Sequence, residues 1–379
     1  MTVAGGRDLV TALAEPGAEH RHDLGIVVHH QDAELLGHGR RLRRAASQGQ
    51  VEYLQLLSPS RRHWIWLAIA VVIGLAALSM FGDVRHLGDR LAGFGWSAFA
   101  AALGLALGNY VLRFGRWQYY LACQDVRVPV GSSALVFGAG LSLSITPGKL
   151  GELVKSYLLR ELHDVPAPRT APIVIAERVT DLIALIVLSL IGVAAYGVDP
   201  RLVGAAGALV AIGLVLLAWP RPTRALIDLV TRPARLRRLR EPLHESLGHL
   251  AALCRPARLV VGTAIAIPAW SCECLGFAVI CNAFPGAHVE VGLATVIYAG
   301  TTIAGALSFL PGGLGVTEGA MTIALVDGAA HVDRATAVAA TLVTRLATLW
   351  FAVALGVILL AIARGRIARR ARGAVAAAR

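Results

Sequence analysis

Apolar segments about as long as a bilayer crossing alternate with short polar breaks between residues 64 and 363. A helix needs about 20 mostly apolar residues to cross the hydrocarbon core of a membrane. The pattern therefore predicts an all-α polytopic membrane protein. We expect six spanning helices, at about 64–81, 97–119, 170–196, 202–219, 259–284 and 335–363.

Two further apolar segments each contain a break rich in glycine and proline. The break in 132–159 reads Pro-Gly-Lys-Leu-Gly-Glu from Pro147, and the break in 291–327 reads Pro-Gly-Gly-Leu-Gly from Pro311. Both residue types interrupt helices. We therefore expect two re-entrant helical hairpins, the first open to the cytoplasm and the second open to the outside.

The distribution of arginines predicts the topology. Residues 220–258 hold nine arginines and three acids, and residues 364–379 hold six arginines and no acid. Cytoplasmic loops of membrane proteins are enriched in such residues. Both termini are therefore expected in the cytoplasm, with 1–63 as a polar segment, partly disordered or interfacial, and 364–379 as a basic tail.

The two halves of the membrane region resemble each other. Each half, 64–196 and 202–363, reads span, span, hairpin, span, and each break is followed by an arginine in the next span, Arg178 or Arg345. Three crossings per half is an odd number, so the second copy must be inverted. Inverted repeats with interrupted segments at matching positions are typical of secondary transporters. The alternative is two unrelated interfacial turns, whereas the repeat predicts two hairpin tips that meet at a central site.

Composition and charge exclude other classes of protein. The chain has 379 residues, a mean hydropathy of +0.63 and 16% charged residues, against about a quarter in soluble domains. The net charge is +12, but the arginines cluster beside apolar segments without the spacing of a nucleic-acid-binding motif. Anionic lipid headgroups are therefore the expected partner, and nucleic acid is not.

Motifs for other chemistry are absent from the sequence. The five cysteines lie in or beside apolar segments, and they lack the spacing of a zinc site. The Pro-Gly-Lys-Leu-Gly break lacks the spacing of a Walker A motif, so ATP-driven pumping is not expected. We expect no cofactor and no metal.

Four blocks of residues resemble the lysylphosphatidylglycerol synthase transmembrane-region family, also called flippase-like domain proteins. The blocks are Arg113-x-x-Arg116-Trp117, residues 146–155, Ala176-Glu177-Arg178-x-x-Asp181, and residues 310–318. The resemblance covers about 64–363. Lys155 departs from it, because it stands where many relatives are expected to have arginine.

The resemblance implies movement of lipids or lipid-linked precursors between the leaflets of the cell (inner, cytoplasmic) membrane. About 16 residues follow the last predicted span, so the soluble aminoacyl-transferase domain of the synthases is not expected, and neither is enzyme activity. The expected ligand is an anionic phospholipid or a polyprenyl-phosphate-linked lipid. A second copy of the chain and a separately encoded lipid-modifying enzyme are the protein partners considered.

Charged side chains at membrane depth cost roughly 2.5–3.5 kcal/mol each on insertion scales, so each one calls for a reason. Arg178 and Arg345 are expected to pair with Glu152 and Glu318 or to bind a lipid phosphate. The glycine-rich amides of the breaks are expected to cradle that phosphate. The predicted substrate-binding residues are Gly148, Lys149, Gly151, Lys155, Arg178, Gly312, Gly313, Gly315 and Arg345.

The acids are expected to organise these cations or to carry protons. For Glu152 and Glu318, the alternative is stabilisation of a helix dipole. Glu273 lies mid-span, where burial disfavours the charged form; the alternative is a neutral acid bonded to a carbonyl that Pro268 frees. Two further candidates, Glu177 and Asp181, share one face of a helix. The alternative to a functional role is that they belong to an ion pair at the membrane interface.

Arg113, Arg116 and Trp117 are predicted to anchor the chain at the cytoplasmic headgroups. Taken together, the sequence predicts a lipid transporter or flippase, with proton coupling through an acid. One alternative is a membrane-embedded glycosyl- or phosphotransferase acting on a lipid-linked substrate. The other is a non-transporting, lipid-binding scaffold, which would tolerate loss of Arg345 and Glu273.

Overall fold

The computed structural model describes residues 88, 90–196, 200–218, 220–233, 236–328 and 330–377. All of them belong to one compact unit, Ala70–Arg379. The predicted polar segment 1–63 and the predicted crossing at 64–81 lie outside the described residues.

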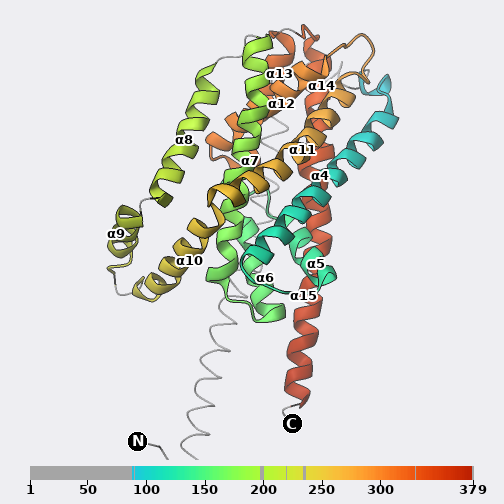
Figure 1. Ribbon diagram of the computed structural model, residues 1–379. Helices are drawn as coiled ribbons and strands as arrows, with labels where there is room; N and C mark the ends of the chain where they lie inside the picture. Colours follow the sequence, from blue (N-terminus) through green and yellow to red (C-terminus); the bar gives the residue numbers. More distant parts are fainter. Residues whose placement is uncertain are drawn as a thin grey trace, which may run out of the picture. The chain divides into compact units, whose positions relative to one another are not determined.

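The described part of the chain folds into helices and contains no β-strand (Figure 1). The elements are α4 (Trp96–Cys123), α5 (Val130–Leu141), η1 (Pro147–Leu153), α6 (Val154–His163), α7 (Ala167–Tyr196), α8 (Pro200–Ala218), α9 (Pro220–Val230), η2 (Arg237–Leu239), α10 (Arg240–Leu253), α11 (Pro256–Cys281), α12 (Val291–Leu307), η3 (Pro311–Gly313), α13 (Val316–Val326), α14 (Arg334–Arg345), the π-helical η4 (Leu346–Trp350) and α15 (Phe351–Ala377).

Three helical stretches of the described residues are long and apolar enough to cross a membrane: α4, α11 and the continuous stretch Arg334–Arg370. They coincide with the crossings predicted at 97–119, 259–284 and 335–363. The prediction of an all-helical, multi-pass membrane protein is confirmed. The count of six crossings, the inverted repeat and the sides of the termini stay predictions.

Both interrupted segments are helix–turn–helix units. Hairpin 1 consists of α5, η1 and α6, and hairpin 2 consists of α12, η3 and α13. In both turns, the two residues after the proline adopt left-handed backbone conformations: Gly148 and Lys149, with φ of 57° and 55°, and Gly312 and Gly313, with φ of 60° and 66°. The two turns therefore share this pair of left-handed residues, and the second turn adds a third positive φ, 84°, at Gly315.

The tips of the two hairpins lie against each other. The elements η1 and η3 are in contact, and a Cβ atom added to Gly312 would lie 3.1 Å from Ile145 Cγ1. The prediction that the tips approach each other is confirmed. Helix α11 packs on α4, α7, α12 and α14, and α15 packs along α5, so long helices surround the two hairpins, while residues of the turns themselves stay exposed.

Candidate functional site

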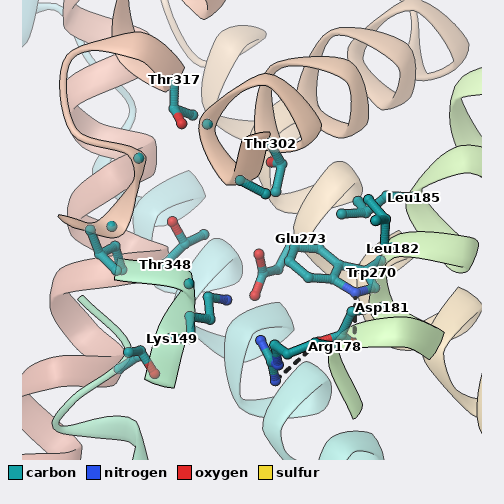
Figure 2. A pocket seen from close by; sticks show the side chains of 18 of the residues that line it. Lys149, Arg178, Asp181, Leu182, Leu185, Trp270, Glu273, Thr302, Thr317 and Thr348 are labelled. Atoms are coloured by element: carbon teal, nitrogen blue, oxygen red, sulfur yellow. Dashed lines mark hydrogen bonds and ion pairs between the residues drawn. The ribbon is translucent and has the colours of Figure 1, made fainter. Parts of the chain in front are cut away.

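A cavity of about 260 Å³ lies where the two hairpin tips meet (Figure 2). Its wall includes residues of both turns, of α4, α7, α11 and α12, and of the segment around η4. One part of the lining is apolar and includes Leu307, Leu310 and Leu349. The other part carries charge, from Lys149, Arg178, Asp181, Glu273 and Arg345.

Lys149 is the exceptional residue of this cavity. It adopts a left-handed conformation with φ of 55°, which costs a non-glycine residue roughly 1–2 kcal/mol. Hairpin 2 has Gly313 at the matching position, where that conformation carries no such cost. The Lys149 amine lies 5.5 Å from the centre of the Trp270 ring, and it forms no ion pair with a described carboxylate. Strained residues of this kind concentrate at functional sites.

Glu152 is the centre of a buried charge network beneath the first turn. Its carboxylate lies 3.5 Å from Arg113 Nη2, 3.3 Å from Lys155 Nζ and 3.4 Å from Arg178 Nη2. The Ser144 hydroxyl donates to the same carboxylate at 3.3 Å. Glu152 thus ties both α4 and α7 to hairpin 1, in agreement with its predicted organising position.

Arg178 connects this network to the cavity. Its Nη2 atom lies 3.1 Å from Asp181 Oδ2, and its side chain keeps 22% of its surface exposed. Asp181 also accepts from Arg116 at 2.7 Å and from the Trp270 indole at 3.1 Å. Figure 2 shows Trp270 beside Asp181, with Arg178 below them. Arg178 is therefore held in place by two acids while part of it faces the cavity.

Lys155 does not lie at the cavity, which corrects its predicted substrate contact. Its amine is buried and lies 2.5 Å from Glu177 Oε2. The rings of Trp117 and Phe137 lie 4.7 and 5.5 Å away. Because this cation is enclosed by an acid and two aromatic rings, it holds hairpin 1 against α7 and α4, and Glu177 is its buried counter-ion.

Arg113, Arg116 and Trp117 are buried inside the helix bundle, which contradicts their prediction as a headgroup anchor. Arg113 points to Glu152, Arg116 donates to the Thr180 hydroxyl at 3.1 Å, and Trp117 donates to the Ser133 hydroxyl at 3.1 Å. An Arg-Arg-Trp cluster near the end of a span resembles an interfacial anchor in sequence. Here the cluster faces inward because acids on hairpin 1 and α7 compensate the arginines.

Arg345 locks the turn of hairpin 2. Its Nε atom lies 2.6 Å from Glu318 Oε1, and its Nη2 atom donates to the Gly312 carbonyl at 2.7 Å. Glu318 in turn accepts from the Gly315 amide at 2.6 Å and caps α13. The ion pair expected between Arg345 and Glu318 is present. Arg345 lines the cavity, but its strongest contacts are internal.

Three of the glycine amides predicted to cradle a phosphate, those of Gly151, Gly313 and Gly315, are used inside the turns instead. The Gly151 amide donates to the Thr146 hydroxyl at 2.7 Å, the Gly313 amide donates to the Leu310 carbonyl at 3.0 Å, and the Gly315 amide donates to Glu318. The turns consume these donors to close themselves. Gly148, Gly312 and Gly313 still line the cavity, so their backbone lies close to any occupant.

Glu273 projects into the cavity from α11 (Figure 2). It accepts a hydrogen bond of 2.6 Å from the Tyr298 hydroxyl, and it forms no ion pair with a described cation. Its hydrogen-bond partner among the described residues is therefore a side chain of α12. The carboxylate remains available at the cavity surface.

The charges around the cavity do not balance. In the buried network, four cations (Arg113, Arg116, Lys155 and Arg178) face three carboxylates (Glu152, Glu177 and Asp181). Arg345 and Glu318 balance each other, as Lys149 and Glu273 do in charge although they form no pair. Among the described residues, one positive charge is therefore left over around the cavity, which favours an anionic occupant.

Sequence reasoning missed three aromatic residues of the site: Tyr110, Trp270 and Tyr298. All three line the cavity, and the Tyr110 hydroxyl donates to the Thr348 carbonyl at 3.1 Å. Single aromatic residues on apolar helices resemble ordinary core residues. The only indication in the sequence is Glu273, because an isolated acid on an apolar helix needs a hydrogen-bond donor from a neighbouring helix.

Comparison with known proteins identifies the family of the chain. Residues 65–356 match the family described as "Lysylphosphatidylglycerol synthase TM region". The chain is also 27% identical, over 321 residues, to a "UPF0104 membrane protein" of Methanothermobacter thermautotrophicus, with 76% of this chain and 93% of that protein covered. The family match at residues 65–356 includes both hairpins, the buried charge network and the residues that line the cavity. The chain belongs to the lysylphosphatidylglycerol synthase transmembrane-region family.

Proposed function

We propose that this protein is an integral membrane lipid transporter that moves a phosphate-bearing lipid, or a lipid-linked precursor, between the leaflets of the cell membrane. Family membership supports a lipid-related role. The observation that carries the proposal is the strained Lys149, which has no ion pair with a described carboxylate, at a cavity between two hairpin tips. In this proposal the protein is not an enzyme.

The proposed architecture has six crossings and two re-entrant hairpins arranged as inverted repeats, with both termini in the cytoplasm. The matching left-handed turns support the repeat, because unrelated turns have no reason to share this conformation at the same two positions. Irregular backbone at membrane depth is tolerated only where protein or a watery cavity covers it. The two tips contact each other and border the cavity, which is the arrangement that this condition requires.

The proposed phosphate receptor consists of Lys149 and the exposed edge of Arg178. Both border the cavity, and the surplus positive charge of the region is available to the phosphate. Ammonium and guanidinium groups form charge-assisted hydrogen bonds with phosphate oxygens. Arg345 holds hairpin 2 through Glu318 and Gly312, and its side chain is 12% exposed against 22% for Arg178, so we assign it to positioning.

The apolar chains of the substrate would remain in the lipid. Leu150, Phe309 and Leu310 at the two turns are 63%, 67% and 44% exposed, and Leu310 also lines the cavity. The apolar rim thus joins the cavity to the surface of the hairpins. A lipid can place its headgroup beside Lys149 and its chains along this rim, whereas a water-soluble anion gains nothing from it.

Glu273 is the proposed proton carrier. It lines the cavity and has a neutral hydrogen-bond partner, so protonation breaks no ion pair. Glu318 is less suited, because protonation would release both Arg345 and the Gly315 amide. Protonation of Glu273 would raise the positive charge of the cavity and strengthen phosphate binding, and loss of the proton would weaken it.

The test of the proposal is a leaflet-exchange assay with Lys149→Gly. Proteoliposomes would carry fluorescent phosphatidylglycerol or a fluorescent polyprenyl phosphate, and exchange would be read from quenching by an external reductant. Lys149→Gly removes the amine and relieves the left-handed strain. We expect a variant at least as stable as the wild type that exchanges lipid at least tenfold more slowly.

Two controls sharpen this result. Lys149→Arg retains the charge and should keep most of the exchange. Lys149→Met removes the charge but keeps the backbone strain, and its exchange should be slow. Full exchange by the glycine variant would overturn the role of Lys149. Absence of exchange by the wild type with both probes would reject lipid transport and favour the transferase or the scaffold.

A further inference from the structure

The segment between α8 and α11 presents an apolar surface that the described part of the chain leaves exposed. Six large side chains are 37–59% exposed there: Leu226, Leu229, Val230, Leu236, Leu239 and Leu243. We name them the apolar row. Leu226, Leu229 and Val230 of α9 follow the spacing i, i+3, i+4, which places them on one face of the helix.

Arginines flank the apolar row. Arg221 and Arg224 are exposed and, with Asp228, follow the spacing i, i+3, i+7 on the opposite face of α9. Arg237, Arg238 and Arg240 are exposed beside Leu236 and Leu239. The segment therefore combines an apolar face with a strongly basic face, as helices that lie in a membrane interface do.

An internal clasp fixes the orientation of this surface. Asp228 accepts from Arg240 Nε at 2.6 Å and lies 2.8 Å from His244 Nε2, which ties α9 to α10. Helix α10 packs on α7, and α9 contacts α8 and α10 (Figure 1). The helices that carry the apolar row are thus packed on α7 and α8 and joined to each other by the clasp.

We propose that α9, η2 and the start of α10 form an in-plane docking surface for anionic phospholipids. The apolar row would enter the boundary between headgroups and acyl chains, and the arginines would contact the lipid phosphates. Charge complementarity selects this occupant, because arginine carries an apolar stem that can lie along acyl chains and a head that can reach phosphate. The surface is separate from the cavity, so it does not depend on transport.

The first arm of the test measures depth in the membrane. The full-length protein in nanodiscs would carry a spin label at Leu229→Cys or, as a matched control on the opposite face of α9, at Arg224→Cys. The signal of the native cysteines would be measured on the unsubstituted chain and subtracted. We expect oxygen and lipid-borne relaxers to reach the label at 229, and a water-soluble relaxer to reach the label at 224.

The second arm measures dependence on lipid charge. The nanodiscs would contain phosphatidylcholine alone or a mixture with phosphatidylglycerol, and depth at 229 is expected to increase with phosphatidylglycerol. A juxtamembrane basic residue contributes about a fivefold preference for anionic lipid. Arg221→Gln with Arg224→Gln should therefore reduce that preference by at least tenfold, whereas Arg366→Gln with Arg369→Gln, an equal loss of charge on α15, should not.

Each outcome decides the proposal. Equal exposure of both labels to the water-soluble relaxer would overturn it and make a soluble protein the better occupant. Burial of the label at 229 with no dependence on lipid charge would overturn the anionic specificity. Burial that depends on phosphatidylglycerol and on Arg221 and Arg224 would establish it.

Discussion

The two lysines of the chain have opposite surroundings. Lys149 is strained, has no carboxylate partner among the described residues and faces the cavity. Lys155, six residues later, is buried against Glu177 and two aromatic rings. Charge and position in the sequence predicted both as substrate ligands, but only the backbone conformation and the packing distinguish them. One hairpin therefore carries both the lysine proposed to contact the substrate, Lys149, and the lysine that forms a structural ion pair, Lys155.

Removal of the Lys155 amine alone should destabilise the protein strongly. Lys155→Met leaves Glu177 as a buried carboxylate without its main counter-ion, which typically costs about 3–5 kcal/mol. Lys155→Met combined with Glu177→Leu removes both charges, and its stability should return to within about 2 kcal/mol of the wild type. Thermal unfolding in detergent measures both. Equal losses in the single and double variants would show that packing, and not charge, decides the stability here.

At the scale of elements, the sequence predicted interruptions better than it predicted contacts. The Pro-Gly breaks located both turns, because few other residues end a helix so reliably. The helices of the segment 220–258 were harder to place, since their polar positions are explained by a clasp between α9 and α10 that sequence spacing does not reveal. The partner of Glu273 was missed for the same reason: Tyr298 belongs to another helix.

The clasp between α9 and α10 should open in acid. The hydrogen bond from Arg240, together with His244, lowers the pKa of Asp228 from 3.8 to about 2. A lowered carboxyl pKa means that the stabilisation is complete above the unfolded value of 3.8 and is lost as the pH falls through about 2. A spin label at Leu226→Cys should therefore become more mobile between these two pH values.

Asp228→Asn supplies the control for the clasp. The amide cannot accept a charge-assisted bond from Arg240, so the label at 226 should be mobile at neutral pH and should change little in acid. A label that stays immobile in this variant would mean that packing of α9 on α8 and α10 suffices without the clasp.

At the scale of the whole molecule, α15 supports hairpin 1 along its length. It packs on α5, and a Cβ atom added to Gly356 would collide with the backbone amide of Ser142, where α5 ends. At the other end of hairpin 1, Arg370 donates to the Glu161 carbonyl at 2.9 Å and to Asp164 at 2.6 Å. Helix α15 therefore contacts hairpin 1 both near its turn, at Ser142, and at the end of α6.

Gly356→Ala should displace hairpin 1. Because the neighbour is backbone, the clash cannot be relieved by a side-chain rotation, and overpacking of this kind costs about 1–3 kcal/mol. Gly365→Ala in the same helix meets only the end of the Arg369 side chain, 4.0 Å away, and should stabilise the protein slightly, because alanine is the better helix former. Thermal unfolding and leaflet exchange report the difference. Equal stability of the two variants would contradict tight packing of α15 on the first turn.

The contact between Ile145 and Gly312 has an evolutionary consequence. Each residue belongs to a different half of the chain, yet a larger side chain at either position must be accommodated by the other. A substitution on one hairpin is therefore expected to be tolerated only with a compensating change on the opposite hairpin. The two halves of this protein therefore cannot diverge independently of each other at their tips. Chimeras that combine halves from distant relatives are expected to pack poorly at this contact.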